Sequence, residues 1–276
     1  MSLKSIVVHL DEKEAAEQRI DVAVEIARRF RGRLRGVYST RGTRAEVDIA
    51  ELAPSEVARQ ISDREAQEHA LSLLTRTAAA ATLLEVEVHV LGADPVDEAL
   101  AEMRCADVSV LSQPDFENDD GGFDRRLLQS ALLGVGGPLL VLPRVRSKFE
   151  VARNIVIAWD GGREAARALR DALPMLASAA RTTLLSIGGT HRLREDAERS
   201  QAQALRLLAA HGVSAKARRV ECTIEPAELL LSQLSDLGAD LLVMGAYGHA
   251  RVREVILGGM TRAVIEKMTV PVFMSH

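Results

Sequence analysis

Short apolar runs alternate with amphipathic stretches along the whole chain. The first run, residues 5–11, predicts a buried strand that ends in an acid. In the stretch that follows, alanine and isoleucine recur at three-to-four spacing, which predicts a helix, and residues 34–38 predict a second strand. Strands and helices that alternate in this way are typical of an α/β protein whose parallel sheets are covered on both faces.

The same opening recurs in the second half of the chain. Residues 154–160 again predict a strand that ends in an acid, a single helix is expected to follow, and residues 184–187 predict the next strand. In both halves 27 residues separate the aspartate, Asp11 or Asp160, from the end of the second strand. The two openings are therefore in register at an offset of 149 residues.

The closing segments of the two halves match as well. Asp107 and Asp240 each lead into an apolar run, and 31 residues after each aspartate a proline begins a final apolar strand. The offset at this end is 133, so the first half carries 16 extra residues. We place them in the polar stretch 39–62, beside a long helix over about 54–80. The chain is thus predicted to be a tandem duplication.

Each half is expected to contain five strands that alternate with helices, and the two domains are predicted at 1–147 and 148–276. The polar strand 215–220 is expected near a sheet edge. With 47% apolar and 27% charged residues in 276, the composition is that of a globular protein of this size.

Charge and cysteine content bound the partners and the compartment. The net charge of −4 gives no electrostatic case for nucleic acid, and no apolar run approaches the length of a membrane span. The N-terminus leads straight into a strand and does not resemble a signal peptide. Cys105 and Cys222 suggest a reducing compartment without a disulfide framework. We therefore expect a cytoplasmic protein that binds neither nucleic acid nor membrane.

A glycine-containing loop near the C-terminus carries the candidate chemistry. The apolar run 241–244 breaks at Gly245 and Gly248, and after nine intervening residues the chain reaches Gly258 and Gly259. Glycine lets a backbone approach a ligand closely, and free N–H groups at a helix start favour an anion. The pattern indicates a phosphate-binding loop; the alternative is a strand–helix connection with glycines for tight packing. It lacks the Walker lysine and the Rossmann glycine spacing.

The loop resembles that of the universal stress protein family. Its glycines match at Gly245, Gly248 and Gly258, whereas Gly259 stands where nucleotide-binding members usually carry serine or threonine. The resemblance covers the chain as two copies and is most specific in the second half. It implies an open five-stranded parallel sheet in each copy, Rossmann-like and of the adenine nucleotide alpha hydrolase type. It also implies that the copies pack as a pseudo-dimer, commonly through their last strands.

The same resemblance implies that the second half binds ATP, or ADP or AMP, with or without Mg²⁺. The role would be regulatory in a stress response, with at most slow ATP hydrolysis. The glycine backbone would hold the phosphates, Asp160 would contact the nucleoside, and Ala158 and Ile187 would line the adenine side. A helix cap is the alternative role of Asp160. The predicted nucleotide-binding residues are Ala158, Asp160, Ile187, Met244, Gly245, Gly248, His249, Gly258, Gly259, Met260, Thr261 and Arg262.

The first half has lost the loop glycines. Ser112, Asp115, Arg125 and Arg126 stand opposite them, and an acidic run, 115–124, lies where phosphate would sit. Because like charges repel and side chains block close approach, we predict that the first half does not bind nucleotide in this way.

Other functions stay open at the level of sequence. There is no nucleophile elbow, no His-Glu-x-x-His and no Cys-x-x-Cys motif. One alternative is an interaction scaffold of the same family that no longer uses nucleotide. Another is an enzyme or electron-transfer protein on the same α/β plan. A protein partner or a homodimer is compatible with each of these functions.

Overall fold

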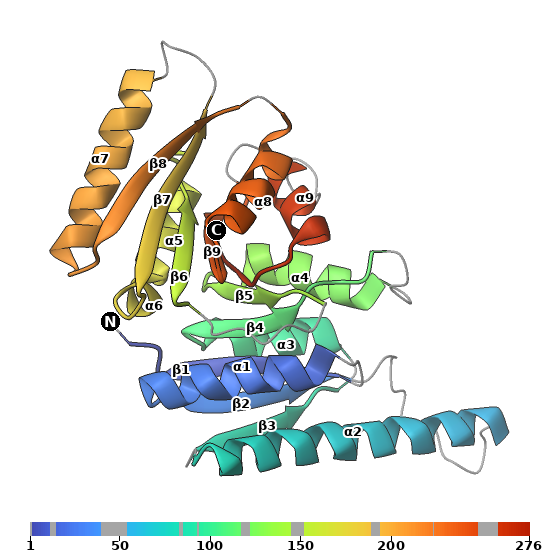
Figure 1. The fold of residues 1–276 in the computed structure, drawn as a ribbon. Coiled ribbons are helices and arrows are strands. Elements are labelled where there is room, and N and C mark those ends of the chain that lie inside the picture. Colours follow the sequence, from blue (N-terminus) through green and yellow to red (C-terminus); the bar gives the residue numbers. More distant parts are fainter. Residues whose placement is uncertain are drawn as a thin grey trace. The chain divides into compact units, whose positions relative to one another are not determined.

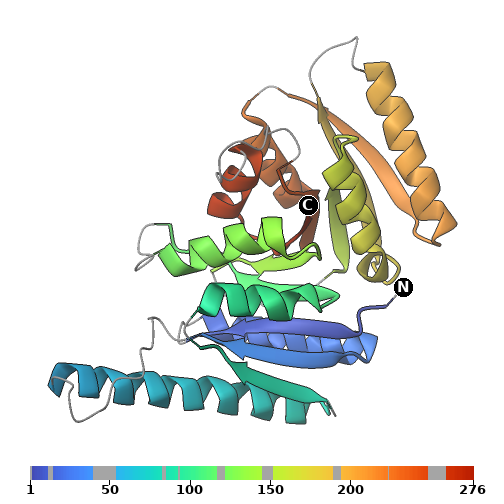
Figure 2. The same cartoon turned by 180° about the vertical axis from the view of Figure 1, so that it is seen from behind.

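The computed structural model describes residues 2–11, 15–39, 54–82, 85–92, 94–116, 122–144, 152–188, 194–222, 224–247 and 259–276. These residues divide into two compact units, Ser2–Val135 and Gly136–His276. Each unit is an α/β structure with a mostly parallel sheet (Figures 1 and 2). The α/β fold predicted from the alternating pattern is therefore confirmed. The predicted domain boundary, between residues 147 and 148, lies outside the described residues.

The N-terminal unit contains four parallel strands in the order β3-β2-β1-β4. Helices α1 and α2 pack together on one face of this sheet, and α3 and α4 pack together on the other (Figures 1 and 2). The elements are β1 (Ser5–Leu10), α1 (Ala15–Phe30), β2 (Arg33–Tyr38), α2 (Pro54–Ala80), β3 (Val86–Val90), α3 (Pro95–Arg104), β4 (Val108–Ser112) and α4 (Phe123–Gly134).

In the C-terminal unit the strand order is β5-β10-β9-β6-β7-β8. All neighbours are parallel except β5 and β10, which pair antiparallel. β5 and β10 are the last strands of the two predicted halves, and the resemblance implies that such strands pair. The elements are β5 (Leu139–Leu142), β6 (Asn154–Ala158), α5 (Arg163–Asp171), α6 (Leu173–Leu176), β7 (Arg181–Gly188), α7 (Arg194–Ala210), β8 (Ala215–Glu221), α8 (Pro226–Asp236), β9 (Leu241–Gly245), α9 (Gly259–Lys267) and β10 (Val272–Ser275).

The predicted helix after β6 is broken into two. The spacing of Leu169 and Leu176 predicts one continuous helix, but α5 ends at Asp171 and a short α6 follows. Pro174 explains the difference, since proline has no N–H to donate and its ring crowds the preceding turn. Both leucines are nevertheless buried, as the pattern predicts. The long helix α2 begins and ends at the predicted residues, and β8 is an exposed edge strand, also as predicted.

The strand registers of the two units agree at the central strands and shift at the outer ones. β4 and β9 align with β1 and β6 at the predicted offsets of 133 and 149. At the second strand, however, Leu34 lies opposite Ile6 while Thr182 lies opposite Ile155, which gives an offset of 148. The match of 27 residues read from the sequence is therefore one residue out of register at this strand. The connection through the broken helix is one residue shorter.

A carboxylate clamp recurs at the amino ends of the central strands. In the N-terminal unit, Asp107 accepts the backbone N–H of Ser5 at 2.9 Å and that of the preceding residue at 2.6 Å. In the C-terminal unit, Asp240 accepts the N–H of Asn154 at 2.9 Å and that of the preceding residue at 3.1 Å. The two clamps stand at the offsets of 149 and 133, so the units share this contact as well as their strand order.

We expect Asp240→Ala to lower the free energy of unfolding by about 1.5–3 kcal/mol, because two backbone N–H groups, that of Asn154 partly buried, lose a charged acceptor. Burial raises the pKa of Asp240 although backbone N–H groups oppose the shift. A raised folded-state pKa means that this group stabilises most below its unfolded pKa and less as pH rises through the folded value. Urea unfolding at acidic pH values that span the titration of Asp240, with Asp240→Asn as the isosteric control, tests both the loss of stability and its dependence on pH. An unchanged midpoint for Asp240→Ala would contradict the clamp.

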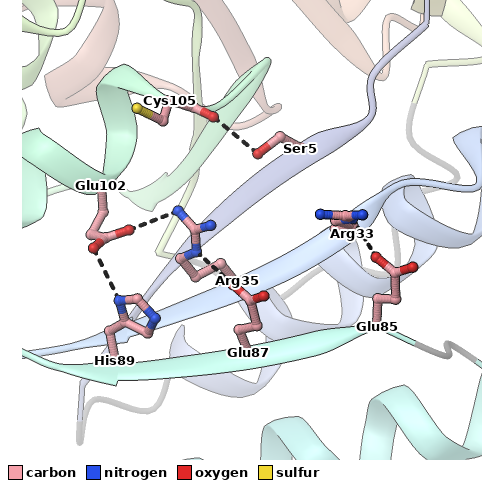
Figure 3. A network of polar contacts seen from close by, with 8 residues as sticks. All are labelled: Ser5, Arg33, Arg35, Glu85, Glu87, His89, Glu102 and Cys105. Carbon is pink, nitrogen blue, oxygen red and sulfur yellow. Dashed lines mark hydrogen bonds and ion pairs between the residues drawn. The ribbon is translucent and has the colours of Figure 1, made fainter.

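The outer strands of the N-terminal unit carry a polar network (Figure 3). Arg35 on β2 pairs with Glu87 on β3 at 3.1 Å and with Glu102 on α3 at 2.7 Å. His89 Nδ1 lies 3.0 Å from the same Glu102 carboxylate. Such half-exposed pairs stabilise a fold little, but charged side chains protect an edge strand from pairing with other chains.

No helix in the described parts of the chain is long and apolar enough to cross a membrane.

Candidate functional site

A cavity of about 460 Å³ lies in the C-terminal unit, at the carboxyl ends of β6, β7 and β9. Open α/β sheets bind ligands at this edge, and the volume is that of a small-molecule site. The lining residues are Ala158, Trp159, Asp160, Glu164, Ala165, Leu185, Ile187, Pro226, Leu230, Met244, Gly245, Tyr247, Gly259, Met260 and Thr261. Most of them are apolar, and a few polar groups lie among them, which is the usual composition of a ligand pocket.

Eight of the twelve sequence-predicted site residues line this cavity. They are Ala158, Asp160, Ile187, Met244, Gly245, Gly259, Met260 and Thr261. Arg262 is not among the lining residues; it is exposed and pairs with Glu266 one turn further along α9, at 2.6 Å. Gly248, His249 and Gly258 lie outside the described residues. The cavity thus brings the strand ends and the start of α9 together, while a nucleotide role for these residues stays a prediction.

Sequence reasoning missed much of the apolar wall. Leu185 precedes the predicted Ile187 by two positions on β7, so strand alternation could have found it. Pro226 begins α8 and Leu230 lies one turn later; the sequence predicts this helix but does not assign it to the site. Trp159 follows Ala158 and donates its indole N–H to Ser200 Oγ at 3.0 Å, which fixes the ring at the cavity.

Gly245 allows α5 to pack closely against the end of β9. A Cβ atom at this position would lie 2.5 Å from both the backbone N of Ala165 and the backbone C of Glu164. Real Cβ atoms essentially never approach so closely, and a helix backbone cannot move aside as a side chain can. The tight-packing alternative therefore holds for Gly245, whether or not its backbone also contacts a ligand. Gly259 has nothing within 4 Å of the same ideal atom.

Two carboxylates stand at the start of α5. Asp160 is exposed, and its Oδ1 accepts the N–H of Gly162 at 2.7 Å, which supports the turn into the helix. Glu164 is buried and pairs with Arg163 at 2.9 Å. Burial opposes its ionisation, but its backbone N–H and then Arg163 outweigh that effect and lower the pKa of Glu164. The alternative role of Asp160 as a helix cap is therefore wrong in detail, because the N-cap of α5 is Gly162 and has no side-chain cap hydrogen bond; Asp160 supports the preceding turn and lines the cavity.

Beside the cavity, a hydrogen bond joins the residue pair after β9 to the start of α9. Tyr247 has a positive φ of 65°, and its N–H donates to Thr261 Oγ1 at 3.3 Å. Its ring meets His276 edge-on with centroids 5.6 Å apart, and its hydroxyl is buried without a hydrogen-bond partner in the structure described. Burial raises the pKa of this phenol. Thr261 is one of the predicted nucleotide-binding residues, and its hydroxyl already accepts the N–H of Tyr247.

The described residues place a cavity at the sheet edge, lined mainly by apolar side chains with a few polar groups among them. Within those ranges, no group of three or more His, Cys, Asp or Glu side chains is placed to hold a metal ion.

The C-terminal unit matches a known family. Residues 152–276 match the model of the universal stress protein family. A universal stress protein of Synechocystis sp. is 28% identical over 150 residues, which cover 52% of this chain and 49% of the relative. The chain therefore matches about half the length of this curated relative.

Solved structures extend the likeness of fold over both units. A universal stress protein from Archaeoglobus fulgidus DSM 4304 has a TM-score of 0.74 at 17% identity, covering 98% of this chain and 96% of that chain. A functionally unknown protein from Pseudomonas aeruginosa PAO1 has a TM-score of 0.59 at 15% identity, covering 99% and 92%. At these identities the comparison shows a shared fold, and it places the N-terminal unit in that fold as well.

Proposed function

We propose that the C-terminal unit binds an adenine nucleotide, ATP, ADP or AMP, and that the chain is a regulatory stress-response protein. The observation that carries the proposal is the 460 Å³ cavity at the carboxyl ends of β6, β7 and β9. It gathers eight residues that the universal stress protein resemblance assigns to nucleotide binding. Ligands of open α/β sheets bind at this edge.

The chemistry of the walls supports a nucleoside with a phosphate chain. Ile187, Leu230 and Met244 offer apolar surface to a base, and the exposed Asp160 can accept ribose hydroxyls. The start of α9 at Gly259 is exposed, and its backbone N–H groups and macrodipole suit phosphate. A magnesium ion that accompanies the nucleotide is expected to be held mainly by the phosphates.

The proposal includes a tandem origin and a regulatory role. The repeated carboxylate clamp and the repeated strand order support descent from a duplicated domain. Regulation through a protein partner or a second copy, in the cytoplasm, is part of the proposal, with hydrolysis at most slow.

Native mass spectrometry and a titration followed by Trp159 fluorescence test the nucleotide site. The indole lines the cavity, so ATP, ADP or AMP should change its emission saturably at one equivalent per chain. Nucleotide at about 100 times Kd should add roughly 2.7 kcal/mol to the free energy of unfolding. Folded protein that neither binds nor is stabilised by any adenine nucleotide would contradict the proposal and favour the interaction scaffold.

A further inference from the structure

The N-terminal unit holds a closed counterpart of the open cavity. A space of only about 10 Å³ is lined by His9, Asp11, Arg19, Leu111, Ser112, Asp124, Leu127 and Leu128. Six of these eight residues stand at an offset of 149 or 133 from residues that line the 460 Å³ cavity. The six are His9, Asp11, Leu111, Ser112, Leu127 and Leu128. The same edge of the same fold is therefore open in one unit and filled in the other.

The Arg19 side chain fills this space. It lies on the inward face of α1, is 0% exposed and is among the largest fully buried side chains of the chain. Its counterpart on α5, at the offset of 149, is Ala168, which is equally buried but ends at Cβ. A charged residue between Ala16 and Ala23 in an apolar stripe is the sequence signal that marks this position.

All three guanidinium nitrogens of Arg19 donate to acceptors at the strand ends. Nη2 donates to Asp11 Oδ1 at 2.7 Å, Nε donates to the His9 carbonyl, and Nη1 donates to Ser112 Oγ. Asp11 is the counterpart of Asp160, and Ser112 that of Gly245. The residues that would face a ligand in the open unit thus bind a side chain of the protein itself.

The acceptor set is suited to a planar cation. A buried charge is tolerated only when it is paired and its remaining N–H groups are satisfied. Arginine presents its donors in a rigid fork, which matches a carboxylate, a carbonyl and a hydroxyl arranged around one point. Asp11 is itself 5% exposed, and His9, whose Nε2 lies 2.6 Å from Ser39 Oγ, closes the wall beside it. The site is built from buried polar groups.

We propose that the N-terminal unit retains a ligand site whose occupant is the guanidinium of Arg19, and that removal of this side chain creates a binding site for a small guanidinium cation. Arg19 acts as an internal ligand, and the site it occupies is selective for a planar cation. This inference concerns the N-terminal unit alone and holds whether or not the C-terminal cavity binds nucleotide.

Chemical rescue tests the proposal in the full-length chain. Arg19→Ala should unfold at a lower temperature than the wild type, and methylguanidinium chloride should raise its melting temperature saturably. The wild type and Arg28→Ala should show no such rise, because Arg28 forms only an exposed pair with Glu25. Methylammonium, which has the charge without the fork, should rescue less. Parallel responses of Arg19→Ala and wild type to methylguanidinium would overturn the proposal.

A double variant separates the ligand site from simple packing. Asp11→Ala combined with Arg19→Ala also removes the buried carboxylate that accepts the Arg19 guanidinium, and it should lose the methylguanidinium response. A response that persists in the double variant would overturn the role of Asp11. If Arg19→Ala does not fold alone, refolding it in methylguanidinium should recover the native fold. Equal refolding yields with methylguanidinium and with sodium chloride would contradict the site.

Discussion

Gly245→Ala is expected to lower the free energy of unfolding by about 3 kcal/mol or more, whereas Gly259→Ala should stay within about 0.5 kcal/mol of the wild type. The two glycines line the same cavity, and the sequence gives both the same role. They differ in what surrounds them. The added methyl of Gly245→Ala would lie 2.5 Å from the backbone of α5, while that of Gly259→Ala would meet nothing within 4 Å.

The loss in Gly245→Ala should be large because both obstructing groups are backbone. Ala165 and Glu164 form the first turn of α5, which packs along β9 and β10, so relief requires the whole helix to shift. Urea unfolding of the three proteins measures the difference. A Gly245→Ala variant as stable as Gly259→Ala would show that α5 lies further from β9 than the structure has it.

The fold could be predicted well from the sequence because its signal is periodic. Apolar runs and amphipathic stretches mark most strands and helices, and the long helix begins at Pro54 as predicted. The break at Pro174 and the single-residue slip at Thr182 were not predicted. Both arise where a local steric rule overrides an approximate repeat, which a periodic pattern does not register.

The candidate site could be predicted only in part. Its glycines and Asp160 are visible because they break an apolar pattern at a strand end. The sequence does not identify Leu230 as a site residue, because its helix reaches the cavity only through the folding of the unit. Arg19 lies on a helix face away from the loop, so the loop pattern does not mark it, although a charge in an apolar stripe is itself a signal. The role of Gly245 required atomic distances.

The asymmetry of the halves has a cause beyond the lost glycines. From the sequence, the absence of a nucleotide site in the first half is predicted to come from Ser112 and from the acidic run after it, which would repel phosphate. Arg125 on α4 donates to the Phe116 carbonyl at 3.2 Å and its guanidinium lies over the Phe116 ring. This arginine therefore contacts a residue that precedes its own helix. The interior differs as well, since the Arg19 guanidinium stands where the open unit has space. Restoring glycines alone would therefore not open a second site.

Ala158→His is expected to lower the affinity for an adenine nucleotide at least tenfold, about 1.4 kcal/mol, with little change in stability. Ala158 is half-buried on the cavity wall, and the N-terminal unit carries His9 at the equivalent position. An imidazole there would occupy volume that the base needs. Because the position borders open space, the folded unit has room for the ring even though a bound ligand does not.

Ala239→His is the matched control for this variant. Ala239 is also half-buried and belongs to the same unit, but it precedes β9, at the opposite end of the strand from the cavity. Fluorescence titration of the wild type and both variants with the same nucleotide gives the comparison. Weakening in Ala158→His alone places the ligand in the cavity. If both variants bind as tightly as the wild type, the nucleotide site lies elsewhere.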